Sequence, residues 1–301
     1  MTGQPARWLT QSWVAENLPH RPDRAHKGDF GRLLVVAGST EYPGAAMLTA
    51  LGAMRAGAGV VRVAVAESVA ARLAGAVPEL TWMVLDEEAP GLIAPSGWRR
   101  LTTEAVEYEA VVVGPGLGRQ PGTQRRTRNL VAALRVPAVI DADGLNALAD
   151  GRSWWTGLRA PLVLTPHPGE FARLVRAEAP PADDDDARSQ AAVDAAQRWQ
   201  QVVVLKGANT VVAGPDGALL RSEVASPALA TAGSGDVLAG VIGAFLAAGL
   251  PPMTAAGCGV AVHAAAGLLA QERIGRAGVM ARDIVALVPQ SIERLRGGTG
   301  R

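Results

Sequence analysis

This chain has a single cysteine and almost no net charge. Cys258 is the only cysteine among 301 residues, so no disulfide can form within the chain, and its Gly/Ala-rich surroundings favour a buried packing role. The formal net charge of +1 gives no electrostatic argument for a nucleic acid or an anionic membrane as partner. Residues 1–20 lack a signal-peptide core, and no apolar stretch reaches membrane-spanning length without polar breaks. These absences predict a soluble cytoplasmic protein.

Short apolar runs that alternate with helical runs dominate the rest of the chain. Hydrophobic residues make up 49% of the sequence, which is ample for the core of one large α/β domain. The alternation predicts right-handed crossovers and a mostly parallel sheet covered by helices on both faces. We expect strands at 33–38, 60–65, 82–85, 110–113, 138–140, 162–164, 202–205 and 210–213. We expect helices at 44–58, 68–73, 124–134, 145–149, 169–175, 188–199, 236–248, 253–271 and 281–294.

Three local patterns refine this architecture. Gly214-Pro-Asp-Gly217 is a hairpin turn signal and predicts an antiparallel pair at one edge of the sheet. Residues 1–28 are polar and form a lead-in, and the absence of an interior linker or repeat predicts a single domain over 1–301. The four aspartates at 183–186 could form a metal cluster, but a solvated loop leading into the helix 188–199 is favoured.

The stretch 229–249 combines a buried helix with a polar beginning. Residues 237–248 are small and apolar on every face, which is typical of a helix buried all round. Gly233-Ser-Gly-Asp236 precedes it, and the free N–H groups and dipole of a helix start form an anion site. A carboxylate beside such a site suits phosphoryl transfer, since it can take the proton of the attacking hydroxyl. The alternative is a Gly-rich turn in which Asp236 only caps the helix.

The ends of the predicted strands carry the other polar clusters. In a parallel sheet, ligands bind beyond the carboxyl ends of the strands, so segments that follow strands meet at one edge. That edge would also hold Gly233–Asp236. The segments in question are 39–44, Gly114-Pro-Gly-Leu-Gly118, Asp141-Ala-Asp-Gly-Leu-Asn146, Thr165-Pro-His-Pro-Gly-Glu170 and Lys206-Gly-Ala-Asn-Thr210.

Charged residues in these segments allow two interpretations each. Asp141 and Asp143 could organise a metal ion or its waters, or Asp143 could cap the following helix. Glu170 is either a first-turn helix charge or a ligand of water on Mg²⁺. Lys206 leaves a buried strand where a cation would reach phosphate, unless it is a surface lysine.

Three further features also remain open. His167 lies between two prolines that fix its backbone, which favours ligand contact over a purely structural histidine. Gly114-Pro-Gly-Leu-Gly118 is either backbone pressed against a ligand or a plain tight turn. His263 lies on a helix face of alanines and is either packed or close to a nucleotide base.

With these motifs in order, the chain resembles the ADP-dependent NAD(P)H-hydrate dehydratase family of the ribokinase-like superfamily. The resemblance spans roughly residues 27–290, and its most specific motifs are Pro-His-Pro-Gly-Glu and Gly-Pro-Gly-Leu-Gly. It implies a three-layer α/β/α fold. The matching segments are 27–31, 35–39, 43–46, 114–118, 141–146, 165–170, 205–210 and 233–240.

The resemblance implies repair of damaged cofactors. Such an enzyme uses ADP and Mg²⁺ to dehydrate the S epimer of hydrated NADH or NADPH and releases AMP and phosphate. Asp236 would be the catalytic base at the hydrate hydroxyl. By motif position, the hydrated dinucleotide would contact Ala45, Gly116, Gly118 and His167. The nucleotide would contact Lys206, Gly207, Ala208, Asn209, Thr210, Gly233, Ser234 and Gly235. Glu170 and Asp141 would hold the metal ion through water.

The resemblance also carries expectations about assembly. It implies a homo-oligomer, a tetramer in the family, and a separate epimerase as functional partner, because the 28 lead-in residues are too few for the epimerase domain of larger relatives. Ser234 stands where many relatives have threonine. Two other functions compete with the dehydratase: a small-molecule kinase of the hydroxymethylpyrimidine type that uses the same Asp236, and a non-catalytic nucleotide-binding regulator.

Overall fold

A central sheet organises the chain, of which the computed structural model describes residues 6–180 and 183–297. Ten strands of the described residues form this sheet. From one edge to the other they are β1 (Arg7–Trp8), β12 (Leu219–Arg221), β11 (Val211–Ala213), β10 (Val202–Leu205), β9 (Leu162–Leu164), β8 (Ala138–Ile140), β7 (Ala110–Val113), β2 (Arg32–Val36), β3 (Val60–Ala66) and β4 (Thr81–Leu85).

The strand order reverses between β2 and β7, and this reversal locates the ligand edge. From β2 the chain proceeds outward to β3 and β4, then returns to β7 and proceeds the other way through β8, β9 and β10, all parallel. Valine, leucine and isoleucine fill the central strands, which are buried along their whole length, as expected for a sheet covered on both faces. Ligands of such sheets bind at the carboxyl ends of strands near the reversal.

The predicted antiparallel hairpin is present, but it does not form the edge of the sheet. β11 runs antiparallel to both β10 and β12 around the turn 214–217. β1, from the lead-in, pairs in parallel with β12 and lies outside the hairpin. The sequence pattern missed β1 because two residues are too few to show a strand period.

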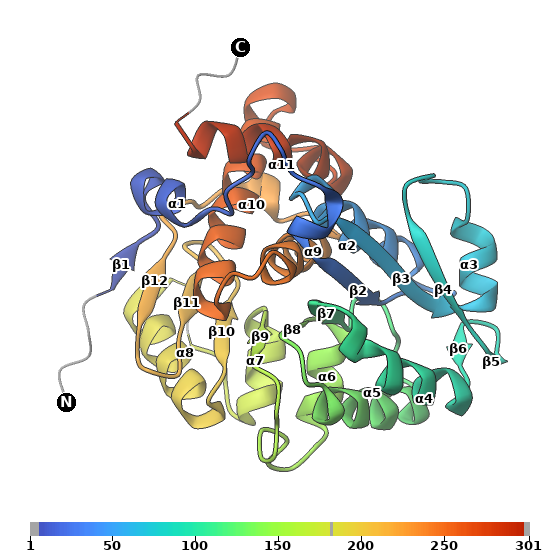
Figure 1. The fold of residues 1–301 in the computed structure, drawn as a ribbon. Helices are drawn as coiled ribbons and strands as arrows, with labels where there is room; N and C mark the ends of the chain where they lie inside the picture. The colour runs from blue at the N-terminus through green and yellow to red at the C-terminus, as the bar shows by residue number, and fades with distance from the viewer. Residues whose placement is uncertain (1–5, 181–182, 298–301) are drawn as a thin grey trace.

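Helices cover both faces of the sheet and confirm the three-layer architecture (Figure 1). Figure 1 shows one layer made of α2 (Pro43–Arg55), α9 (Ser234–Ala247), α10 (Pro252–Ile274) and α11 (Ala281–Leu295). The opposite layer holds α4 (Pro95–Glu104), α5 (Pro121–Ala133), α6 (Asp143–Ala149), α7 (Pro168–Val175) and α8 (Asp185–Trp199). The remaining elements are α1 (Gln11–Asn17), α3 (Glu67–Leu73), the two-stranded sheet β5 (Glu87–Ala89) and β6 (Leu92–Ile93), and the 3₁₀ turns η1 (Lys27–Phe30), η2 (Ala105–Glu107) and η3 (Pro227–Leu229).

Helix α9 is buried all round, as its composition predicts. Apart from Gly235 and Asp236 in its first turn, every residue of α9 is buried. A Cβ atom at Gly240 would lie 2.0 Å from the carbonyl oxygen of Thr49, so only glycine lets α9 approach α2 this closely. The helix begins at Ser234, two residues before the expected start, which places Gly235 and Asp236 in the first turn.

Helix α10 is long and apolar enough to cross a membrane by length and composition. The structure places it differently, because 78% of its apolar 18-residue window is buried against the rest of the chain. It packs on α9 and α11 as a core helix.

The aspartate run at 183–186 is part of a helix start, not only a loop. Asp184 is the N-cap of α8, and its carboxylate accepts a hydrogen bond from the Ala187 amide at 2.8 Å. Asp185 and Asp186 lie in the first turn, where they face the positive end of the helix dipole. The expectation of a purely solvated loop before residue 188 is therefore wrong, because negative charges at a helix start favour three more residues of helix.

Candidate active site

A cavity of about 670 Å³ lies at the carboxyl ends of β9 and β10. Its wall combines the loop 206–210, the segment 222–231, the first turn of α9 and one side of α10. Its polar wall includes His167, Lys206, Ser234 and His263, and its apolar wall includes Val224, Leu229 and Val260. The cavity thus offers charged groups at one part of its wall and an apolar surface at another.

The start of α9 lies at this cavity and has the free N–H groups that the predicted anion site requires. Gly233, the N-cap, has φ +84°, a left-handed conformation that favours glycine. The backbone N–H groups of Gly235 and Asp236 have no hydrogen-bond acceptor within the described ranges. Free N–H groups and the helix dipole together favour a phosphate group at this position.

Lys206 and Asp141 lie directly beside this helix start. The Lys206 ammonium donates to Asp141 Oδ1 at 2.8 Å and lies 3.9 Å from Glu170 Oε2. A Cβ atom at Gly235 would lie 3.2 Å from Lys206 Nζ and 3.8 Å from Asp141 Oδ2, so these groups meet over the first turn of α9. The interpretation of Lys206 as a surface lysine is wrong.

Burial and neighbouring charges shift the pKa values of the site residues. Burial, followed by the charge of Asp141, raises the pKa of Asp236 from 3.8 to about 7, although Lys206 opposes the shift. Burial also raises the pKa of Glu170, again against the effect of Lys206. Burial alone would lower the pKa of Lys206, but the nearby carboxylates outweigh it and the pKa is raised. Lys206 is therefore a cation at neutral pH, and Asp236 is poised to exchange a proton there.

The donor set suits a divalent cation held through water. Oxygen atoms of carboxylates are the ligands that Mg²⁺ prefers, and Mg²⁺ usually keeps several of its waters. Asp141, Glu170 and Asp236 place three carboxyl groups around the one ammonium group of Lys206, so a further cation would favour their ionised forms. No group of three His, Cys, Asp or Glu side chains is close enough for direct ligation within the residues that the structure describes.

His167 and Glu170 form a reciprocal cap at the start of α7. His167 Nδ1 accepts from the Gly169 amide at 3.0 Å, and Glu170 Oε2 accepts from the His167 amide at 2.9 Å. Burial, with Lys206 and Arg173 nearby, lowers the pKa of His167, which keeps the ring neutral. Glu170 is thus a first-turn charge, and it also faces Lys206. His167 has a structural role in addition to its place in the cavity wall.

The loop 114–118 is locked against two neighbouring segments. Gly114 has φ +130°, and a Cβ atom there would lie 1.9 Å from the carbonyl oxygen of Asp141. Gly116 lies against Ala45 and Tyr42, since an added Cβ would be 2.8 Å from the Ala45 Cβ and 2.7 Å from the Tyr42 Cβ. The structure thus brings Ala45 and Gly116 together.

Asp143 does not cap α6, which was one of the two roles that the sequence suggested. Its Oδ2 accepts from the Gly118 amide at 2.9 Å, and its Oδ1 accepts from the Asn146 amide group at 3.2 Å. It is the first residue of α6, and the N-cap is Ala142. The carboxylate therefore fixes the loop 114–118 instead of capping α6.

Ser234 and His263 form a buried pair in the cavity wall. Ser234 Oγ lies 2.9 Å from His263 Nε2. Burial lowers the pKa of His263 to about 4, so this histidine is neutral at physiological pH. His263 is thus a packed residue that also lines the cavity, and its nearness to a nucleotide base stays a prediction.

Several residues that the sequence did not single out line the cavity or pack against the loops around it. Tyr42 is 54% exposed beside Gly116, and its place after a strand and before Pro43 could have indicated it. Arg276 contributes to the cavity wall from the turn after α10. Arg188 and Asp185 support the loop 206–210 from α8, and their spacing of three on a helix was the only signal. The Asn209 side chain donates to Asp185 at 3.0 Å.

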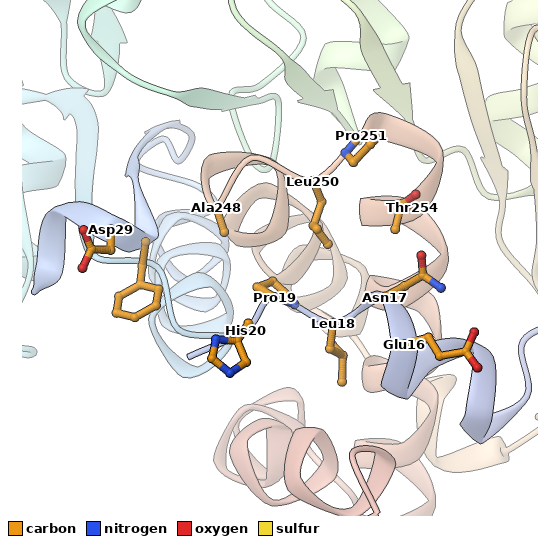
Figure 2. A pocket seen from close by; sticks show the side chains of 11 residues that line it. Glu16, Asn17, Leu18, Pro19, His20, Asp29, Ala248, Leu250, Pro251 and Thr254 are labelled. Carbon is orange, nitrogen blue, oxygen red and sulfur yellow. The ribbon is translucent and has the colours of Figure 1, made fainter. Parts of the chain in front are cut away.

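A second cavity, of about 420 Å³, lies at the other end of α9 (Figure 2). Its wall includes Leu18 and His20 of the lead-in and Ala248, Leu250 and Thr254 around the turn into α10 (Figure 2). None of the sequence-predicted site residues contributes to it. The residues that the sequence predicts for phosphoryl transfer therefore lie near the start of α9 and not near its end.

The three layers of helices, sheet and helices, with the free helix start of α9 at the ligand edge, define a protein of the ribokinase-like fold. A solved structure has the same fold. The ADP/ATP-dependent NAD(P)H-hydrate dehydratase of Bacillus subtilis, co-crystallised with ATP and Mg²⁺, aligns with a TM-score of 0.83 at 31% identity, over 97% of this chain and 99% of that chain. The chain belongs to the NAD(P)H-hydrate dehydratase family, whose model matches residues 33–290.

Two curated relatives are similar to this chain over nearly its whole length. The ADP-dependent (S)-NAD(P)H-hydrate dehydratase of Xanthomonas campestris pv. campestris is 41% identical over 99% of this chain and 100% of its own length. The bifunctional NAD(P)H-hydrate repair enzyme of Moorella thermoacetica is 42% identical over 96% of this chain, which covers 54% of that protein. The chain thus spans about half the length of the bifunctional relatives that it matches.

Proposed function

We propose that this protein catalyses the ADP-dependent dehydration of the S epimer of hydrated NADH or NADPH, with release of AMP and phosphate. The observation that carries the proposal is the meeting of Lys206, Asp141 and Asp236 at the free first turn of α9. That arrangement supplies a cation, an anion site and a base with a pKa near neutrality, all beside one cavity. Membership of the dehydratase family supports the choice of substrate.

The cavity suits the nucleotide. Its apolar wall, with Val224, Leu229 and Val260, would accommodate the adenine base, and its volume of about 670 Å³ is within the usual range for small-molecule sites. The loop 206–210 and the turn Gly233-Ser-Gly235 would bind the phosphates through backbone N–H groups. Lys206 would add a charge-assisted contact to phosphate.

The reaction would proceed by phosphoryl transfer followed by elimination. The Asp236 carboxylate takes the proton of the hydroxyl on the hydrated nicotinamide ring, and the hydroxyl oxygen attacks the terminal phosphorus of ADP while the bond to AMP breaks. The N–H groups at the start of α9 stabilise the charge on the transferred group. The phosphorylated ring then expels phosphate and loses a proton, which restores the dihydronicotinamide.

The carboxylates of Asp141 and Glu170 would hold Mg²⁺ through water. The cation supplies charge neutralisation for the nucleotide phosphates when it is bound. The three carboxyl groups and the single ammonium of this site fit that role, because a bound cation would favour the ionised form of each carboxyl group. Lys206 orients the Asp141 carboxylate through the contact at 2.8 Å.

The hydrated dinucleotide would lie along the neighbouring loops. Ala45, Gly116 and Gly118 would contact it from the edge where the strand order reverses, and His167 would contact it between that edge and the nucleotide cavity. The loop 114–118 offers a surface for this purpose, since the Gly118 amide donates to Asp143 and Gly114 packs closely on the carbonyl of Asp141.

We further propose a single catalytic domain that assembles with copies of itself, as a tetramer. An epimerase acting on the R epimer would be the functional partner, because the dehydratase accepts one epimer. Bifunctional relatives that carry the repair function in a longer protein support this pairing.

One assay tests the proposed function. The protein is incubated with hydrated NADH, Mg²⁺ and either ADP or ATP, and the absorbance of the dihydronicotinamide ring and the free phosphate are followed together. We expect both to rise at equal rates, with AMP as product when ADP is used. A stable phosphorylated product from a pyrimidine alcohol, with no return of absorbance, would instead identify a small-molecule kinase. Nucleotide binding without phosphate release would identify a regulator.

A further inference from the structure

Arg188 is a buried cation that the proposed reaction does not use. It lies on α8, its exposure is only 2%, and it is not part of the cavity wall. An arginine this deeply buried requires partners for its guanidinium group, because an unpaired buried charge is very costly. Its partners are therefore informative about its role.

The Arg188 guanidinium group binds the loop 206–210 through carbonyl oxygens. Nη1 donates to the carbonyl of Ala208 at 2.5 Å, and Nη2 donates to the carbonyl of Leu205 at 3.5 Å. Gly207 packs on the same group, since a Cβ atom there would lie 2.6 Å from Arg188 Nη2. Carbonyl oxygens on both sides of Gly207 thus point toward α8.

Asp185 completes this support from the first turn of α8. Its Oδ1 accepts from Arg188 Nη1 at 3.1 Å, and its Oδ2 accepts from the Asn209 side chain at 3.0 Å. Arg221 of β12 contacts the same Oδ2 at 3.2 Å. Arg188 and Asp185 therefore hold the loop at Leu205, Ala208 and Asn209.

The same loop leaves its backbone donors free. The N–H groups of Gly207, Ala208 and Asn209 have no acceptor among residues 6–180 and 183–297. Gly207 has φ +155° and Asn209 has φ +53°, conformations that turn successive peptide groups out of the strand direction. Consecutive free N–H groups in a turn form an anion-binding concavity. Gly207 and Ala208 lie in the cavity wall.

We infer that Arg188 and Asp185 are positioning residues for phosphate binding by the loop 206–210. By binding the carbonyl side of the loop, the guanidinium group keeps the N–H side directed at the cavity. Its positive charge also lies behind the peptide dipoles, which strengthens their attraction for an anion. The inference rests on the proposed function, because that function identifies the anion as the diphosphate of the nucleotide.

The test compares ligands that differ only in phosphate. Dissociation constants for ADP, AMP and adenosine are measured by calorimetry on the wild type, Arg188→Met, Arg188→Lys and Asp185→Asn. Arg198→Met is the matched control, because Arg198 lies on the same helix and its guanidinium group stacks over the Trp155 ring, 4.7 Å from the centroid, away from the loop 206–210. Loss of charge-assisted positioning should raise the dissociation constant for ADP roughly tenfold in Arg188→Met and leave that for adenosine unchanged. Arg188→Lys should recover part of the loss.

Steady-state kinetics give the second measurement. The KM for ADP should rise in Arg188→Met, while kcat at saturating ADP and the KM for the hydrate stay near wild type. Equal weakening of ADP and adenosine would show that Arg188 only maintains the fold, and unchanged ADP affinity would also overturn the inference. If Arg188→Met does not fold, Asp185→Asn decides by the same comparison. Failure of the wild type to bind ADP would contradict the proposed function itself.

Discussion

The ammonium group of Lys206 donates to Asp141 Oδ1 at 2.8 Å, and this contact joins the ends of two strands at the candidate active site. Asp141 follows β8 and Lys206 follows β10, so the pair spans β9 between them. The Asp141 side chain is only 2% exposed, and a buried carboxylate needs such a partner. Lys206 thus neutralises Asp141 and remains beside the free N–H groups of α9, where the proposed reaction places phosphate.

The first prediction is that Lys206→Met lowers both nucleotide affinity and stability. Loss of a charge-assisted contact should weaken the binding of ADP by roughly 1.5–3 kcal/mol. The buried Asp141 carboxylate loses its partner, which should lower the free energy of unfolding by about 3–5 kcal/mol. Calorimetric titration with ADP and urea denaturation measure the two effects.

A double variant separates the effect on ADP affinity from the effect on stability. Lys206→Met with Asp141→Asn removes the charge and its buried partner together, so stability should largely return while ADP affinity stays low. If the double variant recovers ADP affinity as well, Lys206 acts only on the fold, and its proposed contact with phosphate is wrong.

The second prediction concerns Glu170→Gln. Glutamine can still accept from the His167 amide, so the cap of α7 should persist and the melting temperature should change little. The charge that helps hold Mg²⁺ is lost, so a higher Mg²⁺ concentration should be needed for half-maximal activity. Glu170 also raises the pKa of Asp236, so the acid limb of the rate profile should shift to lower pH. An unchanged Mg²⁺ requirement would remove Glu170 from the metal site.

Most of the fold was predictable because its signals are local. Continuous apolar runs such as Leu33–Val36 and Ala110–Val113 are typical of strands in a sheet covered on both faces. The helix starts were predicted less well. α5 begins at Pro121 and α8 at Asp185, because proline and acidic residues favour first-turn positions that carry no hydrophobic period. β1 gave no signal, since two residues cannot show a strand period.

The site was predictable where chain topology alone brings residues together. Lys206, Asp141 and Glu170 follow three adjacent strands, so the strand rule predicted that they would meet. Side-chain partners were beyond the sequence. Asp143 binds the Gly118 amide and Arg188 binds the carbonyl of Ala208, and both contacts depend on how loops fold back in space. Residue type and spacing do not determine such distances.

The third prediction separates the two roles of His167. Asparagine can replace the imidazole as a cap, whereas alanine cannot, and a lost cap costs about 0.5–2 kcal/mol. His167→Asn should therefore keep the melting temperature of the wild type and raise the KM for the hydrate, because the contact proposed for the ring is gone. His167→Ala should show the same KM and a lower melting temperature. A rise in the KM for ADP of equal size in His167→Asn would place the ring at the nucleotide instead.

The fourth prediction is the pH dependence of activity. The pKa of Asp236 is raised to about 7, mainly by burial and by Asp141, so the proposed base is protonated in acid and free above neutrality. The value of kcat/KM should therefore rise with pH up to about 7 and level off beyond it. A flat profile between pH 5 and pH 8, measured at saturating Mg²⁺, would exclude Asp236 as the titrating base.

The last prediction is that Asp236→Asn separates catalysis from folding. Asparagine cannot take the hydroxyl proton, so kcat should fall by about 10²–10⁴ while ADP affinity stays close to wild type. The stability change should depend on pH in a defined direction. The native pKa of about 7 lies above the ordinary value of 3.8, so wild type loses stability as pH rises between these values, and above the higher value the loss is complete. The asparagine variant does not ionise, so it should match wild type in acid and exceed it at pH 8, as urea denaturation at both pH values would measure. If Asp236→Asn is instead less stable at both pH values and loses activity in proportion, Asp236 is a structural residue of α9, and Asp143 or Glu170 becomes the candidate base.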